Sequence, residues 1–193
     1  MNSTNTCLTP IVDAFITAQE SLKVVKQIVK NPSQYPQSVL AKMPNLFDSQ
    51  VPRDRLNNSL KEIEDLFVLN LWATFERWLR DYLQDKGDNL NITTPKKLGS
   101  QLYDHFTNEV EYWKPENMLD ILKEGIFFDS LQNKQLVGHA KQILNYRNWI
   151  AHGRNPKRLP KITNLVPSTA YRTLNTIIDL ICRAELTELS QNT

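Results

Sequence analysis

The chain has 193 residues, which is within the usual length of one domain and long enough to bury a core without disulfides or a structural metal. Its hydrophobic fraction is 40%, its charged fraction 23% and its formal net charge +2, values that are ordinary for a globular protein and too weakly basic to indicate nucleic acid by themselves. Glycine is scarce at five residues, and Cys7 and Cys182 lie at opposite ends of the sequence, which disfavours a turn-rich β fold and a zinc or disulfide framework.

Hydrophobic residues recur at three- and four-residue steps along most of the chain, and this period predicts amphipathic helices. Thr9-Pro10 and Thr94-Pro95 are typical start signals, Ser168 is the expected cap of the last helix, and Gly87 and Gly153 are the expected stops. In chain order we predict helices over residues 10–30, 54–86, 95–113, 115–122, 130–152 and from 168 onward.

Residues 31–53 contain four prolines, at positions 32, 36, 44 and 52, which interrupt regular structure. We expect an ordered loop that lies over the body of the domain, with one helical turn near Leu40. No alternating strand pattern and no repeat is present in the sequence. The predicted fold is therefore all-α, a helical bundle of five or six helices in a single domain over residues 1–193.

The first ten residues lack the basic start and apolar run of a secretory signal. The longest nearly apolar run, residues 66–73, is too short to cross a bilayer and contains Asn70. We therefore expect a soluble, cytoplasmic protein. The same run is apolar on nearly every side of its helix, so it should be buried either within the domain or by a second subunit.

Three polar side chains gather near the end of the helix predicted over residues 130–152. On a helical wheel Arg147 falls near the centre of the apolar stripe, where a charge is costly unless it is paired or faces a cleft. Asn148 and His152 are four residues apart, hence neighbours at the edge of that stripe. This arrangement suits phosphate binding. The spacing alone equally allows a buried ion pair between Arg147 and Glu76, with Asn148 and His152 only finishing the helix.

A basic segment follows this helix end. From residue 147 to residue 178 there is no Asp or Glu, and this stretch would attract polyanions. Its basic residues are Arg147, Arg154, Lys157, Arg158, Lys161 and Arg172. Arg154, Lys157 and Arg158 are the candidate nucleic-acid-binding residues.

The segment Arg147-Asn148-Trp149-Ile150-Ala151-His152 resembles the signature of the HEPN superfamily, an Arg followed by a polar residue and, after four to six positions, a His. Residues 71–83 also resemble the long second helix of many such domains. The resemblance implies a helical bundle that acts as a metal-independent endoribonuclease without a cofactor. In such enzymes two protomers bring their Arg and His residues into one cleft, and the product is a 2′,3′-cyclic phosphate.

In these roles His152 would exchange protons, Arg147 would hold the phosphate, and Asn148 would position the backbone or orient His152. We accordingly expect a homodimer that cleaves RNA in toxin–antitoxin or antiphage systems, with a cognate antitoxin as a further partner. Some HEPN toxins carry a Tyr two residues after the His, and Arg154 stands at that position here. Control through modification of that Tyr is therefore not expected.

Two alternatives remain open from the sequence: a catalytically silent HEPN module that binds RNA, nucleotide or a protein partner, and an interaction scaffold in which Arg147 is only structural. The remaining candidates favour structural roles. His105 and His139 stand alone on polar or mixed helix faces, and Asp120 and Glu124 form a carboxylate pair with no His nearby, so we predict no metal site. Trp149 is expected to pack in the core, although it could stack on a base.

Overall fold

The computed structural model describes residues 6–47 and 52–191, and within these ranges every regular element is a helix. The all-α class is thereby confirmed. The long helices are α1 (Thr9–Lys30), α4 (Pro52–Asp85), α6 (Lys96–Tyr112), α7 (Pro115–Gly125), α8 (Leu131–Ala151) and α9 (Pro167–Gln191). The short ones are η1 (Pro32–Gln34), α2 (Gln37–Leu40), α3 (Pro44–Phe47) and α5 (Asp88–Asn91), so the expected count of five or six covers only the long helices.

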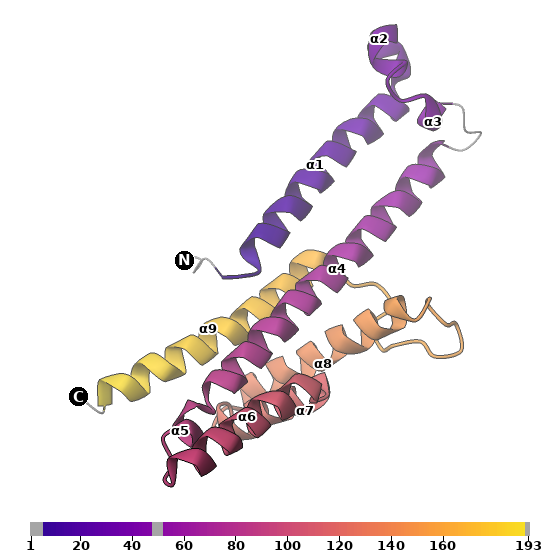
Figure 1. The fold of residues 1–193 in the computed structure, drawn as a ribbon. Coiled ribbons are helices and arrows are strands. Elements are labelled where there is room, and N and C mark those ends of the chain that lie inside the picture. Colours follow the sequence, from indigo (N-terminus) through magenta and orange to yellow (C-terminus); the bar gives the residue numbers. More distant parts are fainter. Residues whose placement is uncertain (1–5, 48–51, 192–193) are drawn as a thin grey trace.

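Helix α4 is the axis of the molecule and contacts α1, α6, α7, α8 and α9. In Figure 1, α1 runs along the first half of α4, while the other long helices surround the second half. Helix α8 also contacts α7 and α9, which places it inside the bundle rather than at its edge. Helix α8 as a whole is therefore held by three neighbouring helices.

The core is built where the predicted apolar stripes of α4, α8 and α9 meet. Each stripe keeps the spacing of three and four residues that the sequence predicts, and burial of each large side chain contributes about 1.5–3 kcal/mol to stability. Its largest fully buried side chains include Trp72, Phe75 and Leu79 from α4, Leu144 and Tyr146 from α8, and Leu174 from α9.

Several helix boundaries differ from the predicted ones by one or two residues. Helix α1 is preceded by Leu8 as its N-cap, so Thr9 is already helical, and α9 begins at Pro167, which places Ser168 inside its first turn. Helix α6 is preceded by Pro95, which follows a cis peptide bond from Thr94 and receives no side-chain cap. The caps expected from Thr9, Thr94 and Ser168 are thus wrong.

Gly87 follows the end of α4, as predicted. It does not, however, adopt the left-handed conformation that a glycine at a helix end commonly has. Its φ is −75° and it is the N-cap of α5. A Cβ atom at this position would lie 2.4 Å from the Phe106 ring. Gly87 is therefore needed for the close approach of α6 to the end of α4.

The Pro-rich segment does contain helical turns near Leu40, in α2, and also in η1 and α3. It lies at the far end of the α1–α4 pair and not over the bundle (Figure 1). The expectation of a loop over the body is wrong for the described part, and residues 48–51, which belong to the same prediction, lie outside the described residues.

The apolar run of α4 is not buried on every side within one chain. Leu66 is 62% exposed, and Asn70 and Ala73 on the same face are also exposed. The sequence predicts that this run is buried either within the domain or by a second subunit. The described residues of the domain do not bury this face. Among the described helices none has the length and apolarity needed to cross a membrane.

Candidate functional site

The last turns of α8 present the predicted site residues, and both ends of this helix are closed by local hydrogen bonds. Ser130 is the N-cap and its hydroxyl accepts from the Asn133 N–H at 3.2 Å. At the other end Gly153 has a φ of +78°, its N–H donates to the Ile150 carbonyl and the Arg154 N–H donates to the Trp149 carbonyl. This is a Schellman ending, and it confirms Gly153 as the stop.

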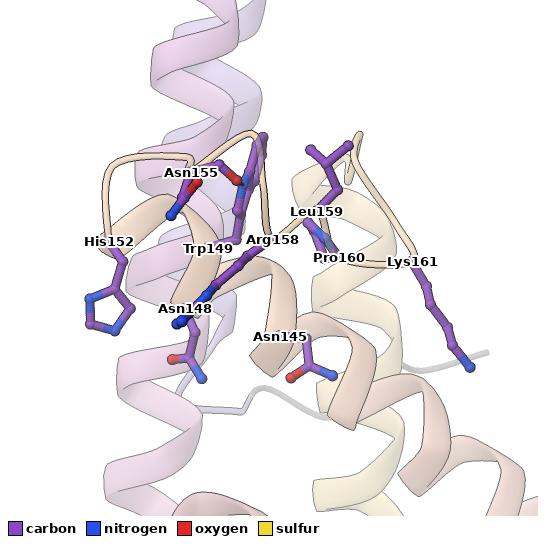
Figure 2. Close-up of a pocket in the computed structure, with 9 residues that line it drawn as sticks. All are labelled: Asn145, Asn148, Trp149, His152, Asn155, Arg158, Leu159, Pro160 and Lys161. Atoms are coloured by element: carbon purple, nitrogen blue, oxygen red, sulfur yellow. Dashed lines mark hydrogen bonds between the residues drawn. The ribbon is translucent and has the colours of Figure 1, made fainter.

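A cavity of about 620 Å³ opens beside this helix end (Figure 2). One wall is α8 and the other is the loop that follows it. The lining residues are Asn145, Asn148, Trp149, His152, Asn155, Arg158, Leu159, Pro160 and Lys161. The lining thus combines amides, apolar surface and three side chains that are or can become cationic, without a carboxylate.

Two of the three predicted catalytic residues, Asn148 and His152, line this cavity. His152 is the C-cap residue of α8 and is exposed, so its imidazole is open to solvent and to a ligand. Asn148 is half-buried, and its Oδ1 accepts a hydrogen bond from Arg147 Nη1 at 3.0 Å. Among the described residues the Asn148 side chain is thus hydrogen-bonded to Arg147, and no hydrogen bond joins it to His152.

Arg147 lies on a second cavity, of about 260 Å³, formed with α4 and α6. Its lining residues are Ala73, Glu76, Arg77, Arg80, Glu111 and Arg147. Within one chain the structure therefore places Arg147 and His152 on different cavities, linked through Asn148.

The ion pair between Arg147 and Glu76, the structural alternative from the sequence, is not formed. Glu76 instead accepts from Arg80 Nη2 at 2.8 Å and from the Trp72 indole at 2.8 Å. Arg147 makes one side-chain hydrogen bond among the described residues, to Asn148, and its buried Nε has no partner there. This guanidinium thus keeps donors for an anion.

A buried carboxylate holds the loop after α8 against α4. Asp65 is 1% exposed, and its Oδ1 accepts from the Tyr146 hydroxyl at 2.7 Å and lies 3.0 Å from Lys61 Nζ. Its Oδ2 accepts from Arg154 Nη2 at 2.8 Å. Lys61 also donates to Asn164 Oδ1 at 3.0 Å, so the start and the end of the loop are both attached to α4.

These contacts shift the pKa values of the groups in this cluster. Burial acts to raise the pKa of the Asp65 carboxyl, but hydrogen bonds from Tyr146, Arg154 and Lys61 outweigh burial and hold that pKa below its ordinary value. Burial, with smaller contributions from Asp65, raises the pKa of the Tyr146 hydroxyl. The hydrogen bonds to Glu62 and Asp65 raise the pKa of Arg154, which stays charged and paired.

The three candidate nucleic-acid-binding residues therefore differ. Arg154 is engaged by Asp65 and by Glu62 at 2.8 Å, so its charge is compensated within the chain. Lys157 and Arg158 are exposed, and neither forms an ion pair with the described residues. Arg158 lines the larger cavity and its side chain runs toward Asn148 in Figure 2.

Sequence reasoning did not name the cluster around Asp65 or five of the cavity residues as parts of the site. These five are Asn145, Asn155, Leu159, Pro160 and Lys161. Asn145 is seven residues before His152, on the same face of α8, and this spacing could have indicated it. The sequence identifies Lys161 only as one of the basic residues in the stretch 147–178, which lacks Asp and Glu. No local pattern points to Asp65, because its partners are remote in the sequence.

The other residues singled out in the sequence occupy positions that fit the structural roles expected for them. His105 and His139 are exposed, Asp120 pairs with Lys141 at 2.6 Å, and the two cysteines are free. Trp149 is half-buried and its indole donates to the Asn155 carbonyl at 3.0 Å.

No protein-family model, curated protein or solved structure matches the chain.

Proposed function

We propose that the protein is a metal-independent endoribonuclease of the HEPN type, with Arg147, Asn148 and His152 as its catalytic residues. The observation that carries this proposal is the composition of the cavity at the end of α8. The exposed imidazole of His152 shares one open cavity, without a carboxylate, with Arg158 and Lys161. Arg147 is hydrogen-bonded to Asn148, which also lines this cavity. Together with a second imidazole from a partner chain, such a set of side chains can bind a phosphodiester and move protons without a metal.

The chemistry assigned to these residues is transfer of a phosphoryl group within RNA. The ribose 2′-oxygen loses its proton to one imidazole and attacks phosphorus, the bond to the 5′-oxygen breaks, and a second imidazole protonates that oxygen. His152 suits both steps because an imidazole can both accept and donate a proton. The Arg147 guanidinium stabilises the charge that builds on the phosphate oxygens. The products are a 2′,3′-cyclic phosphate and a free 5′-hydroxyl.

A second copy of the chain is part of this proposal. One chain supplies one His152, and its Arg147 lies on a neighbouring cavity. A homodimer that joins these surfaces would bring two imidazoles and two guanidinium groups to one substrate. The proposed setting is a toxin–antitoxin or antiphage system in the cytoplasm, with a cognate antitoxin as a partner that would cover the site.

The test is cleavage of RNA by the purified protein in the presence of a chelator. Wild type should release fragments that end in a 2′,3′-cyclic phosphate, whereas His152→Ala should lose cleavage by at least about 100-fold. The variant should keep its helicity and melting temperature, because the His152 side chain is exposed and makes no hydrogen bond to another described side chain. His139→Ala, which removes an exposed imidazole elsewhere on α8, is the matched control.

Cleavage by His152→Ala at the wild-type rate would reject the proposed mechanism. RNA binding without cleavage by wild type would also reject it, and would instead indicate a catalytically silent module that uses the same cavity.

A further inference from the structure

The larger cavity extends beyond what phosphoryl transfer at His152 requires. Its lining continues past Asn148 to Asn145 and Lys161. In Figure 2 the labelled side chains His152, Asn148, Asn145 and Lys161 follow one another in this order across the view. Since Asn145 and His152 are seven residues apart on α8, they are separated by about 10 Å along the helix axis. This distance leaves room in the cavity for a further group beside the imidazole. The part of the cavity away from His152 is called the second compartment below, and it is lined by Asn145, Trp149, Arg158, Leu159, Pro160 and Lys161.

Asn145 supplies a free amide in this compartment. It is exposed, and its side chain makes no hydrogen bond with the described part of the chain. In the two other amides of the cavity the oxygen is already engaged, because Asn148 Oδ1 accepts from Arg147 and Asn155 Oδ1 accepts from the Lys157 N–H. Asn145 thus offers a donor and an acceptor side by side, the pattern that pairs with the edge of a nucleobase.

Apolar surface and positive charge complete the compartment. Trp149, Leu159 and Pro160 belong to its lining and offer surface for the face of a base. Arg158 and Lys161 are exposed, and the described residues place no carboxylate in ion-pair contact with either. Both cations are therefore available to the phosphates on the two sides of that base.

We propose that this compartment is a subsite for one unpaired RNA base, held by Asn145 beside the nucleotide that reacts at His152. The inference rests on the proposed ribonuclease function and names its substrate class as single-stranded RNA. A base within a duplex has its face stacked and its pairing edge occupied, so neither is available to Trp149, Pro160 or Asn145. The amide of Asn145 can pair with the edge of any of the four bases. The subsite therefore distinguishes unpaired from paired bases, and it distinguishes one base type from another less strongly.

The experiment measures binding without cleavage. The probes are short, fluorescent 2′-O-methyl oligoribonucleotides, which lack the attacking hydroxyl, and versions in which one base at a time is replaced by an abasic site. They are titrated with wild type, with Asn145→Ala and with Asn108→Ala, a control that removes an exposed asparagine on α6 away from the cavity. Circular dichroism confirms that all three are folded.

With wild type, one abasic position should weaken binding roughly threefold to tenfold, the range expected for a hydrogen-bonded contact. Asn145→Ala should weaken binding of the intact probe by a similar factor and become insensitive to that abasic position, whereas Asn108→Ala should behave as wild type. A duplex version of the probe should bind more weakly than the single strand.

The inference is overturned if Asn145→Ala binds the intact probe as tightly as wild type, if it weakens intact and abasic probes equally, or if duplex and single strand bind alike. Because these probes cannot be cleaved, the outcome is independent of catalysis. If coupling between Asn145 and one base is found but wild type cleaves no RNA, the subsite stands and the ribonuclease proposal fails.

Discussion

Arg147 and His152 lie near the same end of α8, but they have different surroundings. Replacing them should therefore affect the stability of the protein differently. His152 is exposed beyond the last helical turn, whereas Arg147 is half-buried between α8 and α4. The sequence leaves an ion pair between Arg147 and Glu76 open as the structural alternative, and in the structure Glu76 pairs with Arg80 instead. Removal of Arg147 therefore leaves no buried carboxylate without its counter-charge.

Arg147→Ala should consequently lower the free energy of unfolding by no more than about 1 kcal/mol, while abolishing RNA cleavage. Arg80→Ala is the contrast, since Arg80 is 8% exposed and donates to Glu76 and to the carbonyls of Val110 and Trp113. It should cost about 3 kcal/mol or more. Urea denaturation of the two variants measures both values, and equal losses would show that Arg147 has a structural role comparable to that of Arg80.

The helical wheel could predict the convergence of Asn148 and His152, because that convergence depends only on the local period of one helix. The same wheel placed Arg147 correctly in the apolar stripe. It could not predict the role of Arg154, whose carboxylate partners lie 89 and 92 residues away in the sequence. A basic residue beside a site is indistinguishable from a ligand-binding one until its counter-ions are located.

At the level of elements, the loop after α8 is shaped by Asp65 more than by its own sequence. Arg154 near the start of this loop and Asn164 near its end are both attached to α4, the first directly and the second through Lys61. The residues between them carry Arg158 and Lys161 into the cavity wall. The cluster therefore holds both ends of the segment that forms this wall of the cavity.

Asp65→Asn should lower the free energy of unfolding by about 2–3 kcal/mol, because it removes the negative charge between Lys61 and Arg154. Glu62→Gln, whose side chain is 60% exposed and also contacts Arg154, should cost less than about 1 kcal/mol. Denaturation at neutral pH measures both. Similar losses for the two variants would contradict the assignment of Asp65 as the main anchor.

The pH dependence of this difference follows from the direction of the pKa shift. Asp65 has a pKa below its ordinary value of 3.8, so the stability it contributes is present above that value and is lost as pH falls through the lower, folded-state pKa. The gap between wild type and Asp65→Asn should therefore be constant near neutral pH and shrink below about pH 4. A gap that stays constant into strong acid would show that the carboxylate charge is not its source.

The exposed part of the same loop carries Lys157 and Arg158, to which the proposed function assigns RNA binding. Lys157→Glu together with Arg158→Glu should weaken RNA binding and reduce the slope of log affinity against log salt by about one to two. The fold should persist, because neither side chain is buried or ion-paired with the described residues. Fluorescence anisotropy across a salt titration measures the slope, and an unchanged slope would place the loop outside the RNA footprint.

Helix positions could be predicted from the sequence because the stripes of α4, α8 and α9 are long and regular. Their first residues could not, since cap rules compete with tertiary packing: Pro95 and Leu8 precede α6 and α1 without any side-chain cap. For the Pro-rich segment, the sequence predicts the local structure better than its position in the fold. Its prolines exclude long helices, but they do not indicate whether the segment packs on the bundle or at the end of the α1–α4 pair, as it does (Figure 1).

At the scale of the whole molecule, one face of the central helix α4 is left exposed by the described residues 6–47 and 52–191. Leu66, Asn70 and Ala73 form an exposed stripe on α4 that continues to Arg77. Ala73 and Arg77 also line the cavity that holds Arg147, so the stripe and the Arg147 side chain share one surface. A second copy packed on this stripe would approach Arg147 directly, which is the geometry that a composite active site needs.

We therefore expect a homodimer in solution whose interface includes Leu66. Leu66→Glu places a charge in the interface and should shift the protein toward monomer in light scattering at micromolar concentration, with a matching loss of RNA cleavage. Leu186→Glu, at an equally exposed leucine on α9, is the control and should change neither. Because Leu66 is 62% exposed in one chain, its replacement should hardly affect folding of the monomer, so loss of activity would report assembly. Wild-type protein that is monomeric with full activity, or Leu66→Glu that remains dimeric and active, would exclude this interface.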